Sequence, residues 1–400
     1  MENYLRNVHF SDYFGLSESE LHDSGAIHTA KEIYQQPVVW LKTYQLIRND
    51  RTRIRQFFDK VFASADTDII LTGAGSSSFI GTILQGPFAK FTGRCSRAVA
   101  TTDLLTHPEG YIRKNKPVLL ISFARSGNSP ESSAVVSLVN SICDEAFHLI
   151  ITCNSSGRLV TGTRNKENEL AILLPGETDD KSLVMTSSFT SMLLAGILIT
   201  RINNIEEYEN NVHTLVEYGR KIITNYAGEL RSVAAMEFER VVFLGSGPLL
   251  GAAEESQLKV QELTDGKVVG KHDSYLGFRH GPKAVINPNT LIIYLFSNQE
   301  YVFSYETDLV RDVNAKEKGL YRVGIIESEV QDLEVDLLIE LSEMPQKLDE
   351  EFLAVCSVIP AQLLGFYTCL KYKLRPDNPS QNGSITRIVE GVNIYPFETT

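Results

Sequence analysis

Residues 117–132 read Pro-Val-Leu-Leu-Ile-Ser-Phe-Ala-Arg-Ser-Gly-Asn-Ser-Pro-Glu-Ser, and this stretch decides the fold class. Its first half is a short, almost continuously apolar run, which is typical of a strand buried on both faces. Its second half is a turn of small residues, and Pro130 suits the first turn of a following helix. A buried strand that leads through such a turn into a helix predicts a parallel α/β sheet.

The same pattern recurs along the chain. Apolar runs that precede turns are found at 68–71, 147–152 and 170–174, and again at 241–244, 291–296, 321–326 and 336–341. The second set follows the first at about one domain length, which indicates an internal duplication. We therefore predict two tandem α/β domains, each a mainly parallel sheet flanked by helices. The expected ranges are an N-terminal helical segment 1–43, domains 44–215 and 216–372, and a polar C-terminal tail 373–400.

Composition limits the possible functions. The chain has 400 residues, of which 43% are hydrophobic, so a folded protein is expected. Its formal net charge of −12 gives no basic footprint for DNA or RNA. We find no secretory leader and no uninterrupted apolar stretch of about 18 residues, so neither export nor a membrane span is expected. The 5 cysteines form no CxxC pair, which favours free thiols in the cytoplasm.

Two turns are candidate phosphate sites. The first reads Gly73-Ala-Gly75-Ser76-Ser77-Ser78, where a strand ends and the backbone N–H groups of a new helix are free to bind an anion. A dinucleotide site would have glycine in place of Ser78. In the second turn, Arg125 offers a guanidinium fork, and Ser126 and Ser129 offer hydroxyl donors. The alternative for both turns is a purely structural strand–helix connection.

A third hydroxyl cluster begins with Thr186 and Ser187, before a long apolar helix. Serine and threonine are common N-caps, so this cluster has a structural explanation. It could instead close a sugar-phosphate pocket.

The second half of the chain carries candidate proton-transfer groups. Glu255, Lys259 and Glu262 are spaced to share one face of a helix, although a charged stripe of this kind is usually solvated. His280 lies in the turn Arg279-His280-Gly281-Pro282, where proton transfer is its natural role, but a lone histidine is more often structural. No metal-ligand spacing, Walker sequence or GxSxG elbow is present. We therefore predict neither a metal nor a cofactor.

Together these segments resemble the sugar isomerase (SIS) domain family, and in particular its AgaS-type members. The resemblance is carried by LTGAGSSSFIG (71–81), ISFARSGNSPES (121–132), LGSGPLLGAAEESQLKVQELT (244–264), GFRHGPK (277–283) and the tail RPDNPSQNGSITRIVEGV (375–392). It implies two SIS domains of flavodoxin-like, three-layer architecture. It also implies conversion of D-galactosamine 6-phosphate and water to D-tagatose 6-phosphate and ammonia.

The resemblance also assigns roles to residues. It implies that Glu262 moves a proton between C2 and C1 of the sugar, with Lys259 and Glu255 as charged neighbours. It implies that His280 opens the sugar ring from a partner subunit, so a homodimer or higher homo-oligomer is expected. Phosphate-binding hydroxyls are implied at Ser77, Ser126 and Ser129, with Ser76 adjacent.

The sequence departs in two places from glucosamine-6-phosphate synthase, whose isomerase half also resembles two tandem SIS domains. The Ser-Gln-Ser loop of the synthase is Ala124-Arg125-Ser126 here, and the C-terminal lysine of the synthase has no counterpart in residues 382–386. Two alternatives stay open: a tagatose-6-phosphate ketose/aldose isomerase without deamination, and a non-catalytic sugar-phosphate-binding regulator.

Overall fold

The computed structural model describes residues 12–64, 66–162, 167–328, 330, 332–342, 348–389 and 391–397. The chain forms two compact units. The first-sheet unit consists of residues 39–179, 187–212 and 385–400, and the second-sheet unit consists of residues 1–38, 180–186 and 213–384. The units are thus interleaved in sequence, whereas the sequence pattern led us to expect continuous ranges.

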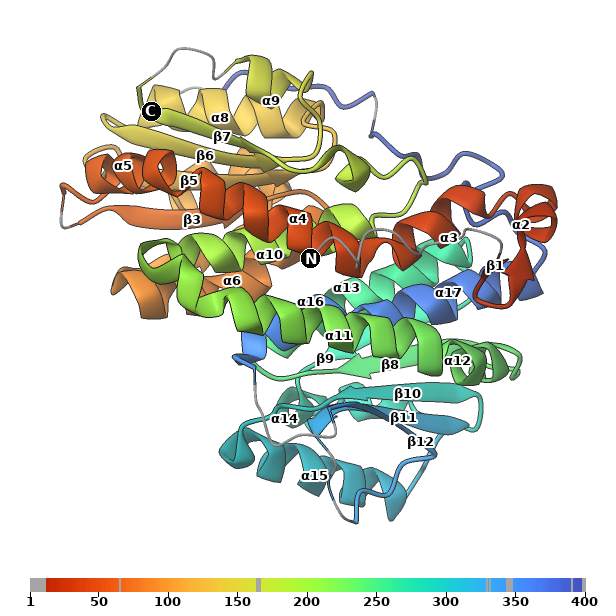
Figure 1. Cartoon of the computed structure of the whole chain (residues 1–400). Coiled ribbons are helices and arrows are strands. Elements are labelled where there is room, and N and C mark those ends of the chain that lie inside the picture. Colours follow the sequence, from red (N-terminus) through yellow and green to blue (C-terminus); the bar gives the residue numbers. More distant parts are fainter. Residues whose placement is uncertain are drawn as a thin grey trace. The chain divides into compact units, whose positions relative to one another are not determined.

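The first-sheet unit contains a five-stranded parallel sheet. Its strand order is β4 (Ser96–Ala98), β3 (Asp68–Thr72), β5 (Val118–Ala124), β6 (Ala146–Thr152) and β7 (Glu169–Leu173). Helix α8 (Pro130–Ile142) covers one face (Figure 1), and α7 (Thr101–Thr106) packs against α8. Helices α6 (Ser76–Thr92) and α10 (Ser187–Thr200) cover the other. Every residue of β3 and β5 is buried because both faces are covered.

The second-sheet unit repeats this arrangement. Its parallel sheet has the order β12 (Leu337–Ser342), β11 (Tyr321–Ser328), β10 (Thr290–Leu295), β8 (Arg240–Leu244) and β9 (Val269–Asp273). Helices α14 (Tyr275–Phe278) and α15 (Glu300–Asn314) cover one face, and α12 (Ala227–Ala234), α13 (Pro248–Leu263) and α17 (Ile359–Lys371) lie on the other (Figure 1). Because both sheets have the strand order 2-1-3-4-5, the predicted fold class is confirmed.

The other α-helices and strands lie outside the two five-stranded sheets and the helices named above. They are the hairpin β1 (Asp12–Tyr13) and β2 (Leu16–Ser17), α2 (Glu18–Ser24), α3 (Ile27–Tyr34), α4 (Gln36–Asn49), α5 (Arg51–Val61), α9 (Arg158–Thr161), α11 (Glu209–Asn225) and α16 (Glu350–Ser357).

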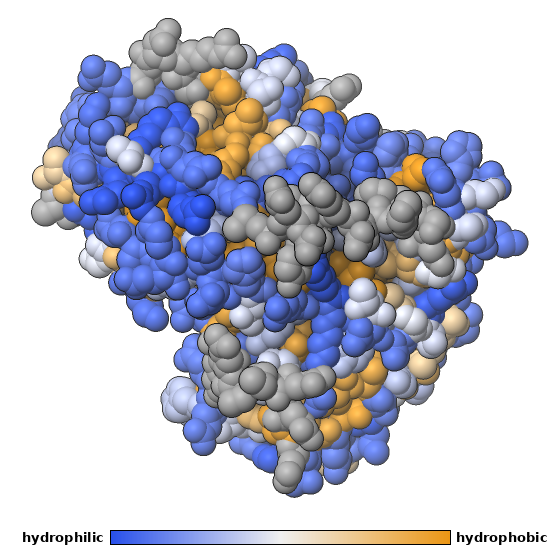
Figure 2. All heavy atoms as spheres, viewed as in Figure 1, coloured by the Kyte–Doolittle hydropathy of each residue, from blue (hydrophilic) through white to orange (hydrophobic). Residues whose placement is uncertain are grey.

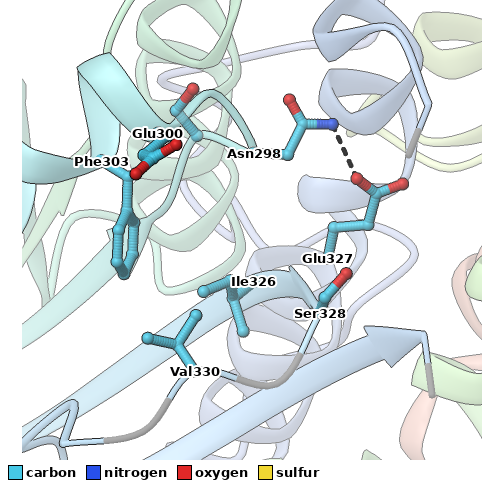
Figure 3. A pocket seen from close by; sticks show the side chains of 8 residues that line it. Asn298, Glu300, Phe303, Ile326, Glu327, Ser328 and Val330 are labelled. Atoms are coloured by element: carbon cyan, nitrogen blue, oxygen red, sulfur yellow. Dashed lines mark hydrogen bonds between the residues drawn. The ribbon is translucent and has the colours of Figure 1, made fainter. Parts of the chain in front are cut away.

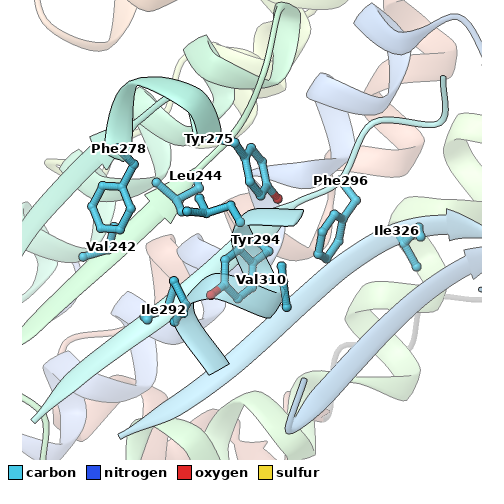
Figure 4. Packing of buried hydrophobic residues seen from close by; sticks show 11 residues of the cluster. Val242, Leu244, Tyr275, Phe278, Ile292, Tyr294, Phe296, Val310 and Ile326 are labelled. Atoms are coloured by element: carbon cyan, nitrogen blue, oxygen red, sulfur yellow. The ribbon is translucent and has the colours of Figure 1, made fainter. Parts of the chain in front are cut away.

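An aromatic cluster fixes the short helix α14 against the second sheet (Figure 4). The Tyr275 and Tyr294 rings stack with centroids 6.0 Å apart, and Tyr294 also stacks on Phe296. Phe278 packs in the same cluster and is fully buried. Burial raises the pKa of both tyrosines, so their hydroxyls stay protonated at neutral pH. Because this cluster fixes α14, the turn that follows it and carries His280 starts at a fixed position.

One helical stretch of the second-sheet unit is strongly hydrophobic. Residues Glu350–Lys371, which form α16 and α17, are long and apolar enough to cross a membrane, but 94% of the apolar window is buried inside the fold. These helices pack against α12 and α13 of their own unit. Hydrophilic side chains predominate on the face of the molecule shown in Figure 2. We therefore assign this stretch to the core of the second-sheet unit. All five cysteines are free, and four of them are buried.

Candidate active site

The strand order of the first sheet reverses between β3 and β5, and we refer to the carboxyl ends of these two strands as the first-sheet crevice. From β3 the chain first adds β4 on one side and then β5 on the other, so the connections diverge between the carboxyl ends of β3 and β5. Open α/β sheets bind ligands at such a point. The first glycine turn follows β3, and the Arg125 loop follows β5.

The glycine turn after β3 is sterically specified. A Cβ atom on Gly73 would lie 2.4 Å from the backbone carbon of Ser77, and Gly75 has a φ of 56°. Helix α6 therefore starts immediately at Ser76, with its N-terminus at the crevice. Ser76 and Ser77 are buried, whereas the Ser78 hydroxyl donates to the Gly75 carbonyl at 2.7 Å. The Ser77 and Ser78 amides donate to the Ala74 and Gly75 carbonyls, so what the turn offers an anion is the start of α6 and its small side chains.

The loop after β5 is held by its own hydrogen bonds. The Ser126 hydroxyl accepts from the Asn128 amide at 3.2 Å, and the Ser129 hydroxyl caps α8 by accepting from the Ser132 amide at 3.2 Å. Ser129 therefore caps α8, which fits the alternative of a structural strand–helix connection. A hydroxyl that accepts one bond still has a proton to donate. The Ser126 hydroxyl thus remains able to bind a phosphate oxygen, whereas the Ser129 hydroxyl also lies 3.0 Å from the Ser132 hydroxyl and would have to release that contact.

Arg125 is buried at the end of β5, with only 8% of its surface exposed. Its Nη2 atom donates to the Arg387 carbonyl of the tail at 2.7 Å. The Arg387 side chain in turn donates to Asp179 at 2.7 Å. The tail thus lies over the Arg125 loop within the first-sheet unit. Sequence reasoning gave Arg387 no role, and its only signal was its place in the tail motif.

Thr186 and Ser187 are adjacent in sequence and both fully buried. The Thr186 amide donates to Asp180 at 2.8 Å in the second-sheet unit, and the Ser187 hydroxyl donates to the Glu177 carbonyl at 3.3 Å in the first-sheet unit. Ser187 is the first residue of α10. Neither of these two bonds is a helix cap, because the Thr186 bond uses the backbone amide and the Ser187 hydroxyl donates to a carbonyl outside α10. The capping and substrate-binding interpretations both stay predictions.

Helix α13 gathers the predicted proton-transfer groups. The Lys259 Nζ atom lies 2.5 Å from Glu262 Oε2 and 3.4 Å from Glu255 Oε1. Glu255 and Lys259 are fully buried, whereas 23% of the Glu262 side chain is exposed. The three residues share one helix face, as their spacing predicted, and this face is not a solvated surface stripe. The arrangement leaves Glu262 as the accessible carboxylate, positioned by a buried ammonium group.

His280 lies on the turn that follows α14, and it is exposed. Gly281 has a φ of 120°, which a residue with a side chain would adopt only with strain. The turn is tied to α15 on both sides of His280. Asp312 lies 3.9 Å from Arg279 and also binds Lys283. These contacts keep the His280 ring at the surface.

The site residues thus fall into three groups. Ser76, Ser77, Arg125, Ser126 and Ser129 lie at the crevice of the first sheet, the α13 residues lie together, and His280 occupies its own exposed turn. Among the residues that the structure describes, no group of three or more His, Cys, Asp or Glu side chains could hold a metal ion.

Comparison with known proteins points to one family. A model described as SIS domain matches residues 62–200. A D-galactosamine-6-phosphate deaminase AgaS from Shewanella sp. (strain ANA-3) is 38% identical over 96% of this chain and 95% of that protein. A solved protein from Clostridium novyi NT has a TM-score of 0.94 at 38% identity, over 96% of this chain and 99% of its own. The tagatose-6-phosphate ketose/aldose isomerase from Escherichia coli has a TM-score of 0.85 at 35% identity, over 93% of this chain and 97% of its own.

Proposed function

Because this chain belongs to the AgaS family of SIS-domain proteins, we propose that it is an amino-sugar-phosphate deaminase/isomerase. It converts D-galactosamine 6-phosphate and water to D-tagatose 6-phosphate and ammonia. The observation that carries this proposal is the buried Lys259 between Glu255 and Glu262. Of these two acidic side chains, Glu262 is the one that is partly exposed. A carboxylate can move a proton between adjacent carbons because it can reach both.

The first-sheet crevice binds the phosphate group in this proposal. Arg125 supplies the positive charge, and Ser76, Ser77, Ser126 and Ser129 supply hydroxyl donors beside the N-terminus of α6. Thr186 and Ser187 complete the set of substrate-binding residues. Holding the phosphate fixes the position of the reacting carbons relative to the protein.

The chemical steps use acid–base groups only. His280 assists ring opening, and Glu262 removes the C2 proton, so that an enolamine forms. Return of that proton to C1 gives an imine at C2. Water adds to the imine and the C–N bond breaks. Ammonia is released, and the ketose is the other product. These steps balance without an oxidant or a metal, so the activity is expected to persist in chelator.

The Glu262→Gln variant tests the assignment. It should abolish both ammonia release and exchange of the C2 proton with solvent, while the protein remains folded. Glu254→Gln is the matched control, because it makes the same chemical change on the same helix outside the Lys259 cluster. Normal ammonia release by Glu262→Gln would refute the proposed base.

Plain ketose/aldose isomerisation is the second candidate function. The Escherichia coli relative is named a tagatose-6-phosphate ketose/aldose isomerase, which is the observation that favours it. An ammonia assay with D-galactosamine 6-phosphate, beside an isomerisation assay with D-tagatose 6-phosphate, separates the two. A protein that binds both sugar phosphates and turns over neither would instead be a sugar-phosphate-binding regulator.

We also infer that the enzyme acts in the cytoplasm as a homodimer or higher homo-oligomer, with no nucleic-acid or membrane partner. The exposed position of His280 is compatible with a site completed by a second copy. Mixing the inactive Glu262→Gln and His280→Asn variants tests the shared site. Recovery of activity in the mixture supports it, and a mixture as inactive as its components contradicts it.

A further inference from the structure

The C-terminal tail contacts the proposed phosphate site through a residue that the proposed reaction does not use. The Arg387 carbonyl accepts from Arg125 Nη2 at 2.7 Å, and the Arg387 side chain donates to Asp179 at 2.7 Å. We call the ion pair between Arg387 and Asp179 the tail latch. All three residues belong to the first-sheet unit. One tail residue thus contacts the Arg125 guanidinium through its backbone and a carboxylate through its side chain.

Asp179 is a firm anchor for the latch. It ends a 3₁₀ turn, Gly176–Thr178, which follows β7 of the same sheet, and its amide donates to the Gly176 carbonyl at 3.3 Å. Thr178 is fully buried, and its hydroxyl donates to the Pro175 carbonyl at 2.7 Å. The carboxylate of the latch is therefore carried by a turn that its own hydrogen bonds fix to the end of the sheet.

The bond from the tail suits an arginine that binds phosphate. A backbone carbonyl is neutral, so this bond orients the Arg125 guanidinium without neutralising the charge that attracts a phosphate. A carboxylate in the same place would also orient the side chain, but it would compete with the phosphate. A long side chain that is ordered in advance also loses less rotamer freedom when its ligand arrives.

The loop after the equivalent strand of the second sheet has a different arrangement. The Asn298 side chain there points toward Glu327, to which it donates at 2.6 Å (Figure 3). The same nitrogen atom donates to the Leu348 carbonyl at 2.7 Å. Since an amide nitrogen has two hydrogens, both are used within the protein. A side chain is thus held after each central strand, but in the first sheet it is a cation that a neutral acceptor orients.

The tail latch has little to contribute to stability. Its Arg387 and Asp179 side chains are 31% and 40% exposed, and ion pairs at such positions stabilise proteins weakly. The start of the tail has its own anchor in the second-sheet unit, where Asp377 accepts from the Thr29 amide and hydroxyl, each at 2.8 Å. Breaking the latch should therefore displace the residues around Arg387 while the fold persists.

We propose that Arg387 and Asp179 are positioning residues for binding of the sugar phosphate. The tail latch keeps the Arg387 carbonyl on Arg125, and this bond holds the Arg125 guanidinium in the orientation that receives the phosphate. The proposal rests on the proposed function in one respect, which is the assignment of the phosphate to Arg125.

Isothermal titration of the full-length protein with D-tagatose 6-phosphate tests the proposal, because both candidate activities share this ligand. Arg387→Ala and Asp179→Asn should each weaken binding roughly tenfold, as expected for the loss of one well-placed hydrogen bond to a charged group. Arg387→Lys can keep the ion pair and should retain most of the affinity. Arg55→Ala, an exposed change on α5 of the same unit, should bind like wild type. All four variants should melt close to wild type.

A double-mutant cycle shows whether the latch acts through Arg125. Arg387→Ala should have almost no further effect on affinity in a protein that already carries Arg125→Ala, because the group that it positions is gone. Additive effects of the two changes would overturn the positioning role. Weak binding by Arg125→Ala beside normal binding by Arg387→Ala would overturn the latch alone. Normal binding by Arg125→Ala would instead refute the phosphate assignment of the proposed function, and the latch proposal with it.

Discussion

Replacing Glu306 by glutamine should remove a pH-dependent loss of stability from the second-sheet unit. Glu306 is fully buried on α15, and its Oε2 atom accepts from the Ser297 amide at 2.8 Å. Burial raises the pKa of this carboxyl group from 4.5 to about 7, and nearby Glu350 contributes in the same direction. Glutamine has almost the same shape as the protonated side chain and cannot ionise.

The direction in which stability changes with pH follows from proton binding. Between pH 4.5 and about 7, the folded state holds a proton on Glu306 that the unfolded state has released, so stability falls as the pH rises through this window. Each pH unit across it corresponds to about 1.4 kcal/mol. Glu306 therefore costs the wild-type protein about 3 kcal/mol at pH 8 relative to pH 4.5. For a unit of this size, that is roughly 5–10 °C in melting temperature.

Melting temperatures measured from pH 4.5 to 8.5 test this expectation. Wild type and Glu306→Gln should melt together at pH 4.5, and the variant should melt at the higher temperature at pH 8. Some pH dependence will persist in the variant, because burial also raises the pKa of Glu350. Glu229→Gln, an exposed change on α12, should follow wild type throughout. If the Glu306→Gln curve ran parallel to wild type across the window, the buried carboxyl group would not be the cause.

Three further outcomes are expected. Gly73→Ala should destabilise the protein by about 1–3 kcal/mol and weaken phosphate binding, because its Cβ atom would lie 2.4 Å from the Ser77 backbone. Gly86→Ala, with open space around its Cβ position in helix α6, should be neutral or stabilising in thermal melts. Arg125→Ala should raise KM for the phosphorylated substrate roughly 10–100-fold with a smaller change in kcat, and an unchanged KM would move the phosphate elsewhere. Lys259→Met should cost about 3 kcal/mol in denaturation and also lower kcat, because two acidic side chains lose the buried cation between them; unchanged values of both would contradict its positioning role.

The sequence predicted the fully buried central strands and also β7 and β12, which are only partly buried but contain runs of Leu and Ile. Residues of β3, β5 and β10 are buried without exception, so their apolar runs stand out. The edge strands β4 and β9 were missed, because β4 has only three residues and most β9 residues are partly buried. Neither Ser96–Ala98 nor Val269–Asp273 contains a long apolar run.

Local spacing also predicted the cluster on α13, since residues three, four and seven positions apart share a helix face. Burial of that face depends on packing by distant segments, and no local pattern reports it. The bond from Arg125 to the Arg387 carbonyl joins residues 262 positions apart. Its donor could be recognised from chemistry, but its acceptor is a backbone atom, which has no signature in the sequence.

The duplicated sheets differ most where their strand order reverses. At the end of β5 the first sheet has Arg125, whereas the equivalent strand β10 is followed by Ser297 and Asn298, beside the buried carboxyl groups of Glu306 and Glu350. Since a phosphate needs positive charge or free donors, only the first crevice suits it. The duplication therefore predicts one sugar phosphate bound per chain rather than two, and Arg125→Ala should reduce that stoichiometry towards zero at a fixed substrate concentration.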